Sequence, residues 1–253
     1  ADTDITKIDT LYNFKSTGGI LHTVEKCNGS GDCRKLSFAG GTMCPSYRAT
    51  LDEKDSTRGR ANVLREFLTQ NTKENPFDHP EIKEAMELCV SCKACKSECP
   101  SNVDMASLKA EFLYQYQKTN PVSLRSKLIA HNAKINAIAH RFAGFYNFIG
   151  KSTWFKSLIG VHPKRSLPTL HSQTLGQWFP SVQQKNYSES VYLFCDEYTN
   201  HFDVEIGKKT ILLLNELGYN VLMPDHSESA RAYISKGFLE EAKTIATENV
   251  STF

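Results

Sequence analysis

Apolar residues recur at helical spacing in the first half of the chain. Residues 57–68 place apolar side chains at three- and four-residue intervals, which predicts a helix. Residues 80–88 start with proline and acidic residues, the chemistry of a first helical turn. Asp104 is placed to cap a third helix over residues 105–117. We expect a mostly α-helical region here.

A second helical pattern covers residues 121–160, where apolar positions recur every three to four residues and basic residues occupy the opposite face. The pattern consists of Leu128, Ile135, Ile138, Phe142, Phe145 and Ile149, with Lys127, Lys134 and Arg141 opposite. Such a stripe either packs on its own domain or docks on a membrane surface or another subunit. Residues 162–188 contain three prolines and read as a linker.

The last region alternates strand and helix patterns. Residues 190–194 and 219–223 are strand-like, and residues 204–217 and 239–250 are helical. This order predicts a parallel strand pair with a crossover helix. Because a stable open sheet normally has more than two strands, we expect the natural protein to continue beyond Phe253.

The charge balance and the composition of the N-terminus argue against several classes of protein. The 253 residues include 30 Lys and Arg against 28 Asp and Glu, so no strong field favours nucleic acid. No apolar run reaches the roughly 18 residues of a membrane span. The N-terminus is acidic and polar, unlike a secretory signal. It lacks an initiator Met, as expected of either an excised segment or a processed terminus.

The eight cysteines carry the main chemical signal, and seven of them lie in two short clusters. A chain of this length does not need disulfides to fold, and such crowding is typical of metal binding in a reducing, cytoplasmic compartment. Cys195 stands alone on a predicted strand and is interpreted as a buried small hydrophobe.

The stronger cluster is Cys89, Cys92, Cys95 and Cys99, followed by Pro100, which is the spacing of bacterial ferredoxins. Two-residue gaps let one loop present three thiolates to a cubane, while the fourth Cys serves the other cluster. Zinc is the competing metal, but four Cys within eleven residues are crowded for one tetrahedral ion.

The weaker cluster is Cys27, Cys33 and Cys44, with Ser30 where a middle Cys would stand. By the ferredoxin exchange rule, Cys44 completes a [4Fe-4S] site with Cys89, Cys92 and Cys95. Cys99 then joins Cys27 and Cys33, leaving three thiolates. That site suits a [3Fe-4S] cluster, or a [4Fe-4S] cluster whose last iron is bound by Ser30, water or another group. Nearby glycines fit either loops packed on sulfide or ordinary turns.

These residues give the chain a specific resemblance that covers nearly its whole length. It resembles the C-terminal iron–sulfur part of FAD-linked 2-hydroxyacid dehydrogenases, including D-2-hydroxyglutarate dehydrogenases. Glycolate oxidase iron–sulfur subunits, anaerobic glycerol-3-phosphate dehydrogenase and heterodisulfide reductase subunits are more distant relatives. The stretches that carry the resemblance are EKCNGSGDCRK, GGTMCPSYRATLDEKDSTRGRANVLREFL, CVSCKACKSECPSNVDMASLKAEF and AYISKGFLEEAK.

The resemblance implies three domains: an α-helical ferredoxin domain with two clusters over residues 1–120, the helical segment and linker over residues 121–188, and a partial α/β domain over residues 189–253. The last is similar to the cysteine-rich CCG domain, but the family's cysteines would fall at Glu197, Glu228 and Ser229. The special cluster of heterodisulfide reductases therefore cannot form there. His226, Glu228 and Arg231 either bind an anion or form a solvated loop.

Arg58 and Arg60 match the family's RGR stretch. They either pair with Asp52, Glu53 or Asp55 nearby or offset the negative charge of reduced clusters.

The resulting hypothesis is an electron-transfer module. A flavin oxidises a 2-hydroxy acid, and the clusters pass its electrons singly to an unknown acceptor. No dinucleotide fingerprint occurs in these residues, so FAD is expected in another domain or a partner subunit. Peripheral membrane association stays open. The alternatives are a structural or docking iron–sulfur module and the iron–sulfur subunit of a glycerol-3-phosphate dehydrogenase or heterodisulfide reductase-like complex.

Overall fold

The computed structural model describes residues 8–183 and 187–253, which form two compact units. Unit 1 consists of Ala1–Val122 and Ile234–Glu240, and unit 2 of Ser123–Tyr233 and Glu241–Phe253. The described residues are mostly helical, with one two-stranded sheet, which confirms the predicted fold class. None of the described helices has the length and apolar character required to cross a membrane.

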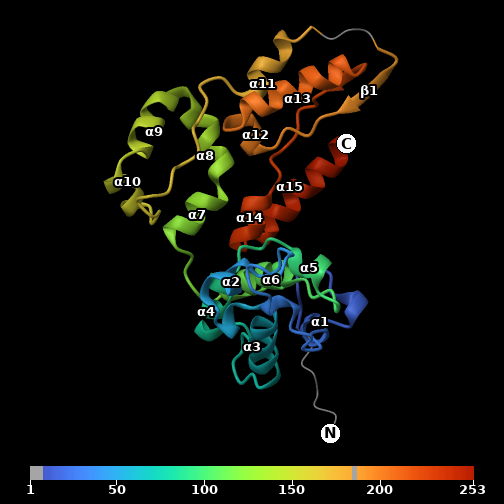
Figure 1. Ribbon diagram of the computed structural model, residues 1–253, viewed down its shortest axis with the longest axis vertical. Helices are drawn as coiled ribbons and strands as arrows, with labels where there is room; N and C mark the ends of the chain where they lie inside the picture. The colour runs from blue at the N-terminus through green and yellow to red at the C-terminus, as the bar shows by residue number, and fades with distance from the viewer. Residues whose placement is uncertain (1–7, 184–186) are drawn as a thin grey trace. The chain divides into compact units, whose positions relative to one another are not determined.

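Unit 1 is a cluster of short helices around one apolar core (Figure 1). The α-helices wholly within it are α1 (Ile20–Glu25), α2 (Pro45–Thr50), α3 (Thr57–Thr69), α4 (Pro80–Glu87), α5 (Ala94–Glu98) and α6 (Met105–Gln117). Its 3-10 turns are Lys15–Thr17, Asp32–Arg34 and Glu53–Asp55.

Local capping chemistry sets where these helices begin. The Ser56 side chain accepts a hydrogen bond from the Gly59 N–H at the start of α3, and Asp104 accepts from the Ser107 N–H at the start of α6. Pro80 stands in the first turn of α4. All three predicted helices are confirmed to within a residue or two.

Long-range contacts in unit 1 join segments that are distant in sequence. The buried Glu111 carboxylate on α6 accepts hydrogen bonds from the Leu11 and Tyr12 N–H groups, at 3.1 and 2.9 Å. The turn between α14 (Arg231–Lys236) and α15 (Leu239–Thr252) belongs to this unit. The Gln117 side chain donates to the Lys236 carbonyl at 2.7 Å and fixes that turn on α6.

Unit 2 contains the remaining helices and the sheet. Its helices are α7 (Leu124–Ala130), α8 (Asn132–Ala139), α9 (Ala143–Gly150), α10 (Thr153–Leu158), α11 (Leu175–Trp178), α12 (Glu197–His201) and α13 (Val204–Glu216), with 3-10 turns at His140–Phe142 and Phe179–Ser181. Helix α11 lies in the stretch predicted as a linker. A capping box between Thr174 and Gln177 starts it, and its Leu175 is fully buried.

The sheet pairs β1 (Glu189–Tyr192) with β2 (Tyr219–Leu222) in parallel, which confirms the predicted pair. Val191 lies opposite Val221, and both contribute to the core that unit 2 builds with α11 and α13. Gly218 ends the connection from α13 with a φ of 93°, in the left-handed region that favours glycine. The predicted boundaries at residues 120 and 188, and the likeness to a CCG domain, remain predictions.

Candidate iron–sulfur centre

The loop from Cys89 to Cys95 winds through two left-handed residues. Ser91 and Lys93 have φ values of 53° and 61°, which is unusual for residues with a side chain. Alternating backbone of this kind turns successive N–H groups toward one point, a geometry suited to an anionic group. Helix α5 begins at Ala94, directly after Lys93, so Cys95 lies in its first turn.

The loop from Cys27 to Cys33 follows the same backbone course. Gly29 and Gly31 stand two and four residues after Cys27, as Ser91 and Lys93 stand after Cys89, and their φ values are 78° and 80°. Ser30 therefore occupies the loop position that Cys92 occupies in the other motif. Both of these side chains are exposed.

One cavity collects cysteines from both motifs. Cys44, from the first motif, lines it together with Cys89, Cys92 and Cys95. Arg60 is on the same lining, whereas Cys27, Cys33 and Cys99 are not among the described residues that form it.

The N-terminus of α3 lies between the predicted sites. The Thr57 N–H donates to the Cys44 sulfur at 3.1 Å, and the Thr57 hydroxyl lies 3.0 Å from the same sulfur. That hydroxyl also hydrogen-bonds the Cys95 thiol. One residue further on, the Arg58 N–H donates to the Cys33 sulfur at 3.4 Å. The positive end of the helix thus faces sulfurs from three loop positions.

Cys33 and Cys44, which are assigned to different predicted sites, also hydrogen-bond one another. A hydrogen bond from Cys44 lowers the pKa of the Cys33 thiol to about 6, while the same bond raises the pKa of Cys44. Burial raises the pKa of the Cys95 thiol, because a thiolate loses hydration there.

Glu98 fixes the Cys44 loop on α5. Its carboxylate accepts hydrogen bonds from the Thr42 N–H at 2.8 Å, the Thr42 hydroxyl at 2.5 Å and the Met43 N–H at 3.1 Å. These bonds, led by the Thr42 hydroxyl, lower the pKa of Glu98. The short helix between Cys95 and Cys99 therefore holds the loop that carries Cys44.

The two predicted arginines have different surroundings. The Arg58 Nε pairs with Glu53 at 2.7 Å, and its Nη1 lies 3.4 Å from the Gly29 carbonyl in the first cysteine loop. Arg60 is only 1% exposed, and its guanidinium donates to the Ala85 carbonyl and the Ser46 hydroxyl, 3.6 Å from Asp55. The structure thus shows the pairing with Glu53 and Asp55, and the role of these arginines in offsetting cluster charge stays a prediction.

Sequence reasoning missed Thr57 and Lys109. The Lys109 ammonium donates to the Cys89 carbonyl, and burial lowers its pKa. The available signal for Thr57 was the Ser-Thr pair at a helix start just before the arginines. Nothing local in the sequence distinguishes Lys109 from an ordinary surface lysine.

The donor set fits iron–sulfur chemistry. All eight cysteines are free thiols, and seven of them lie on three loops of unit 1. Across the described residues, no three side chains of His, Cys, Asp or Glu form a chelate for a single metal ion. A cubane has four separate iron corners, so its thiolates are spread around it.

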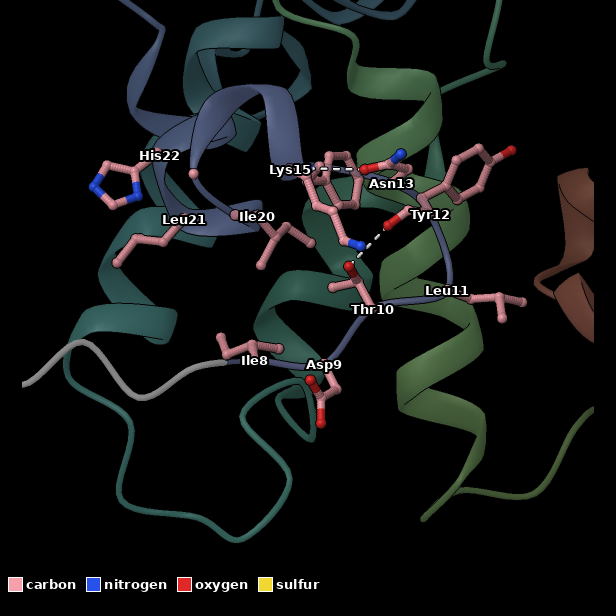
Figure 2. Close-up of a pocket in the computed structure, with 13 residues that line it drawn as sticks. Ile8, Asp9, Thr10, Leu11, Tyr12, Asn13, Lys15, Ile20, Leu21 and His22 are labelled. Atoms are coloured by element: carbon pink, nitrogen blue, oxygen red, sulfur yellow. Dashed lines mark hydrogen bonds between the residues drawn. The ribbon is translucent and has the colours of Figure 1, made fainter.

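A larger cavity of about 690 Å³ lies elsewhere in unit 1, along residues 8–15 and 18–22. Figure 2 shows its wall, with the Thr10 hydroxyl donating to the Tyr12 carbonyl at 2.9 Å and the Lys15 N–H donating to Asn13 at 3.0 Å. None of the predicted ligands lines it, so the candidate chemistry stays with the smaller cysteine cavity.

The positions in unit 2 where the family's cysteines would fall belong to a hydrogen-bond network. The Ser229 N–H and hydroxyl donate to the two carboxylate oxygens of Glu197, at 2.9 and 2.8 Å. Arg231 pairs with Asp196, and His226 accepts from the Cys195 N–H at 3.0 Å. Burial raises the pKa of Glu228 beside this network. His226 and Arg231 have protein partners, whereas one buried carboxylate oxygen of Glu228 has none, so the anion site stays a prediction.

Comparison with known proteins finds a family model that matches the cysteine region. Residues 23–103 match the family model of the 4Fe-4S dicluster domain. The cysteine region is therefore similar to 4Fe-4S dicluster domains. The match confirms the iron–sulfur character predicted for this region. No solved structure shows significant similarity to the chain.

The chain is also similar to several oxidoreductases and oxidoreductase subunits. It is 26% identical to D-2-hydroxyglutarate dehydrogenase of Pantoea ananatis, over 88% of this chain and 26% of that protein. It is 28% identical to one of the subunits of anaerobic glycerol-3-phosphate dehydrogenase from Escherichia coli, over 60% of this chain and 40% of that protein. Glycolate oxidase iron-sulfur subunit of the same organism is 31% identical over 28% of this chain and 16% of that protein. The predicted resemblance is confirmed, and the chain spans about a quarter of the length of the D-2-hydroxyglutarate dehydrogenases.

Proposed function

We propose that the chain carries two iron–sulfur clusters that conduct electrons from a flavin, located in another domain or subunit, to an external acceptor. The observation that carries the proposal is the cavity shared by Cys44, Cys89, Cys92 and Cys95. A flavin that has accepted a hydride carries two electrons. Bound clusters would take these electrons up one at a time. The D-2-hydroxyglutarate dehydrogenase relatives support a 2-hydroxy acid as the ultimate electron donor.

We propose one [4Fe-4S] cluster held by Cys44, Cys89, Cys92 and Cys95. The shared cavity and the Thr57 hydroxyl, which contacts both Cys44 and Cys95, support this set. The second cluster, [3Fe-4S] or [4Fe-4S], takes Cys27, Cys33 and Cys99, with Ser30 available at the fourth loop position. The contact between Cys33 and Cys44 supports the competing set of Cys27, Cys33 and Cys44.

The chain's own groups prepare both sites for negative charge. Backbone N–H groups at the start of α3 donate to the sulfurs of Cys44 and Cys33, which stabilises their thiolates. Arg58 and Arg60 add positive charge beside the two loops. Free thiols of this kind favour a reducing compartment, so we propose a cytoplasmic location.

Cysteine variants separate the two ligand sets. Cys44→Ala should damage the cluster of Cys89, Cys92 and Cys95, whereas Cys99→Ala should damage the cluster of Cys27 and Cys33. Cys195→Ser is the matched control, because Cys195 lies in the other unit and outside both motifs. Iron and sulfide analysis with electron paramagnetic resonance of the anaerobic proteins should show opposite clusters affected. Loss of the same cluster in both variants would rule out the exchange.

Electron transfer is tested separately from ligation. The reconstituted chain should contain about seven to eight iron atoms and be reduced and reoxidised repeatedly by photoreduced FAD and an acceptor dye. Iron bound in the expected amount but inert to reduction would instead favour the alternative, a structural or docking module. Bound zinc with no sulfide would rule out both the electron-transfer module and the structural or docking iron–sulfur module.

A further inference from the structure

Helices α7 to α10 of unit 2 expose large apolar side chains to solvent. Phe145, Phe148 and Trp154 are 68, 76 and 71% exposed. Other apolar residues on these helices and their connections are also exposed: Leu124, Leu128, Ile135, Ile138, Phe142 and Leu158. Soluble domains scatter single exposed apolar residues, but a succession of this length marks an interaction surface.

The spacing of these residues forms a ridge. Phe142, Phe145 and Phe148 follow one another at three-residue intervals, which places them on one side of α9 and the turn before it. Trp154 and Leu158 are four residues apart and share one side of α10. The sequence pattern predicted a helix that either packs on its own domain or docks elsewhere. In unit 2 these side chains are left uncovered.

The same part of the chain has an unusual charge distribution. Residues 112–188 contain ten Lys and Arg and no Asp or Glu. Because the whole chain has 30 basic and 28 acidic residues, the remainder has 20 basic and 28 acidic residues. The near-neutral total therefore conceals one strongly cationic stretch. Among the described residues, Arg125, Lys127 and Arg141 have no ion-pair partner.

A basic cavity adjoins the ridge in the same unit. It measures about 440 Å³ and is lined by Arg125 and by residues 160–162 and 165–168. Arg125, His162 and Arg165 supply its donors, and the remaining lining is glycine, serine, proline and aliphatic side chains. Guanidinium groups bind phosphate oxygens in a planar, bidentate arrangement. The cavity is therefore suited to a phosphate-bearing headgroup.

We propose that α7 to α10 form a docking surface for anionic phospholipid, with the aromatic ridge in the headgroup–acyl boundary and the basic cavity on a lipid phosphate. Aromatic residues beside Lys and Arg are the composition of interfacial helices. Cores of protein–protein interfaces are depleted in lysine, which disfavours a protein occupant for this Lys-rich face. The complete lack of carboxylates over residues 112–188 removes repulsion from an anionic leaflet.

Vesicle flotation of the 253-residue chain tests the proposal. The chain should float with phosphatidylcholine vesicles that contain phosphatidylglycerol, and binding should weaken as salt rises. Phe145→Ser with Phe148→Ser should reduce the partition coefficient by about tenfold or more. Arg125→Gln, Arg141→Gln and Arg165→Gln should each reduce it by about fivefold. The matched controls are Leu213→Ser and Lys209→Gln on α13, which should leave the partition coefficient unchanged. Both residues are exposed, Leu213 by 60%.

Three results would overturn the proposal. These are no flotation with anionic vesicles, equal binding to phosphatidylcholine alone, or equal losses in the controls. A protein occupant is the other outcome: the Phe variants would then lose association with the flavin-binding domain or subunit while the chain ignores vesicles. Flotation does not need the clusters, and iron content and reduction are measured separately, so failure here is distinguishable from failure of the proposed electron transfer.

Discussion

Ser30 differs from Cys92 chemically while sharing its place in a loop. The paired φ values at Gly29 and Ser91, and at Gly31 and Lys93, give the two loops one backbone course. The difference between the two sites therefore comes from one side chain. The proposed site has three thiolates instead of four, and cluster potentials depend on the net charge of the ligands.

Ser30→Cys should lower the reduction potential of the cluster proposed at Cys27, Cys33 and Cys99, because it supplies a fourth thiolate. Where the native site holds three irons, the count should also rise from about seven to about eight per chain. Potentiometric titration followed by electron paramagnetic resonance measures both. Ser37→Cys is the control, since Ser37 is exposed and lies outside both loops. An unchanged potential would mean that Ser30 does not face the cluster.

At the scale of elements, α3 packs closely on the turn before it. A Cβ added at Gly59 would lie 2.0 Å from the Glu53 carbonyl oxygen, a backbone atom that cannot rotate away. Gly144 in α9 has nothing within 4 Å of the equivalent point. A side chain is therefore sterically blocked at Gly59 but has open space at Gly144.

Gly59→Ala should reduce the free energy of unfolding of unit 1 by about 2–3 kcal/mol, because the new methyl group forces the helix away from the turn. Gly144→Ala should instead raise the stability of unit 2 by about 0.5–1 kcal/mol, through helix propensity. Urea unfolding followed by circular dichroism measures both. A stability gain in Gly59→Ala would show that α3 and the turn are less closely packed.

The elements differ in how far local sequence defines them. Helices α3, α4 and α6 were predictable because their caps lie within three residues of their starts. The packing of Gly237 against Leu113 was not, since its partner is more than a hundred residues away in the sequence. Spacing alone predicted the grouping of Cys44 with Cys89, Cys92 and Cys95, which line one cavity, and their role as ligands stays a prediction. The contacts of Thr57 with two sulfurs needed the folded chain, because they depend on how three loops meet at one helix end.

At the scale of the whole molecule, each unit has its own core and its own buried polar groups. In unit 2, His201 is 5% exposed, and its ring lies 5.9 Å from that of His140. Burial, followed by repulsion from His140, lowers the pKa of His201 to about 4, although Glu197 acts in the opposite direction. As pH falls, His201 therefore takes up a proton near pH 6.5 in the unfolded chain but only near pH 4 in the folded chain.

Unit 2 should consequently lose stability as pH falls from 6.5 to 4, by up to about 3 kcal/mol. The sign follows because the unfolded state holds more protons in this range. His201→Gln should flatten the dependence, whereas His162→Gln, at an exposed position, should retain it. Chemical unfolding at several pH values, with a signal from Trp178 in the unit 2 core, measures the effect. A slope that survives in His201→Gln would assign it to other groups.

One helix end donates N–H groups to sulfurs of both predicted sites, through Thr57 and Arg58. We expect this arrangement to affect how the two proposed clusters are inserted. When the first cluster is inserted, it immobilises the start of α3, so the second insertion orders less backbone and is more favourable. With iron supplied below saturation, native mass spectrometry should find empty and doubly loaded chains in excess over singly loaded ones. A statistical distribution of the three would mean that the sites mature independently.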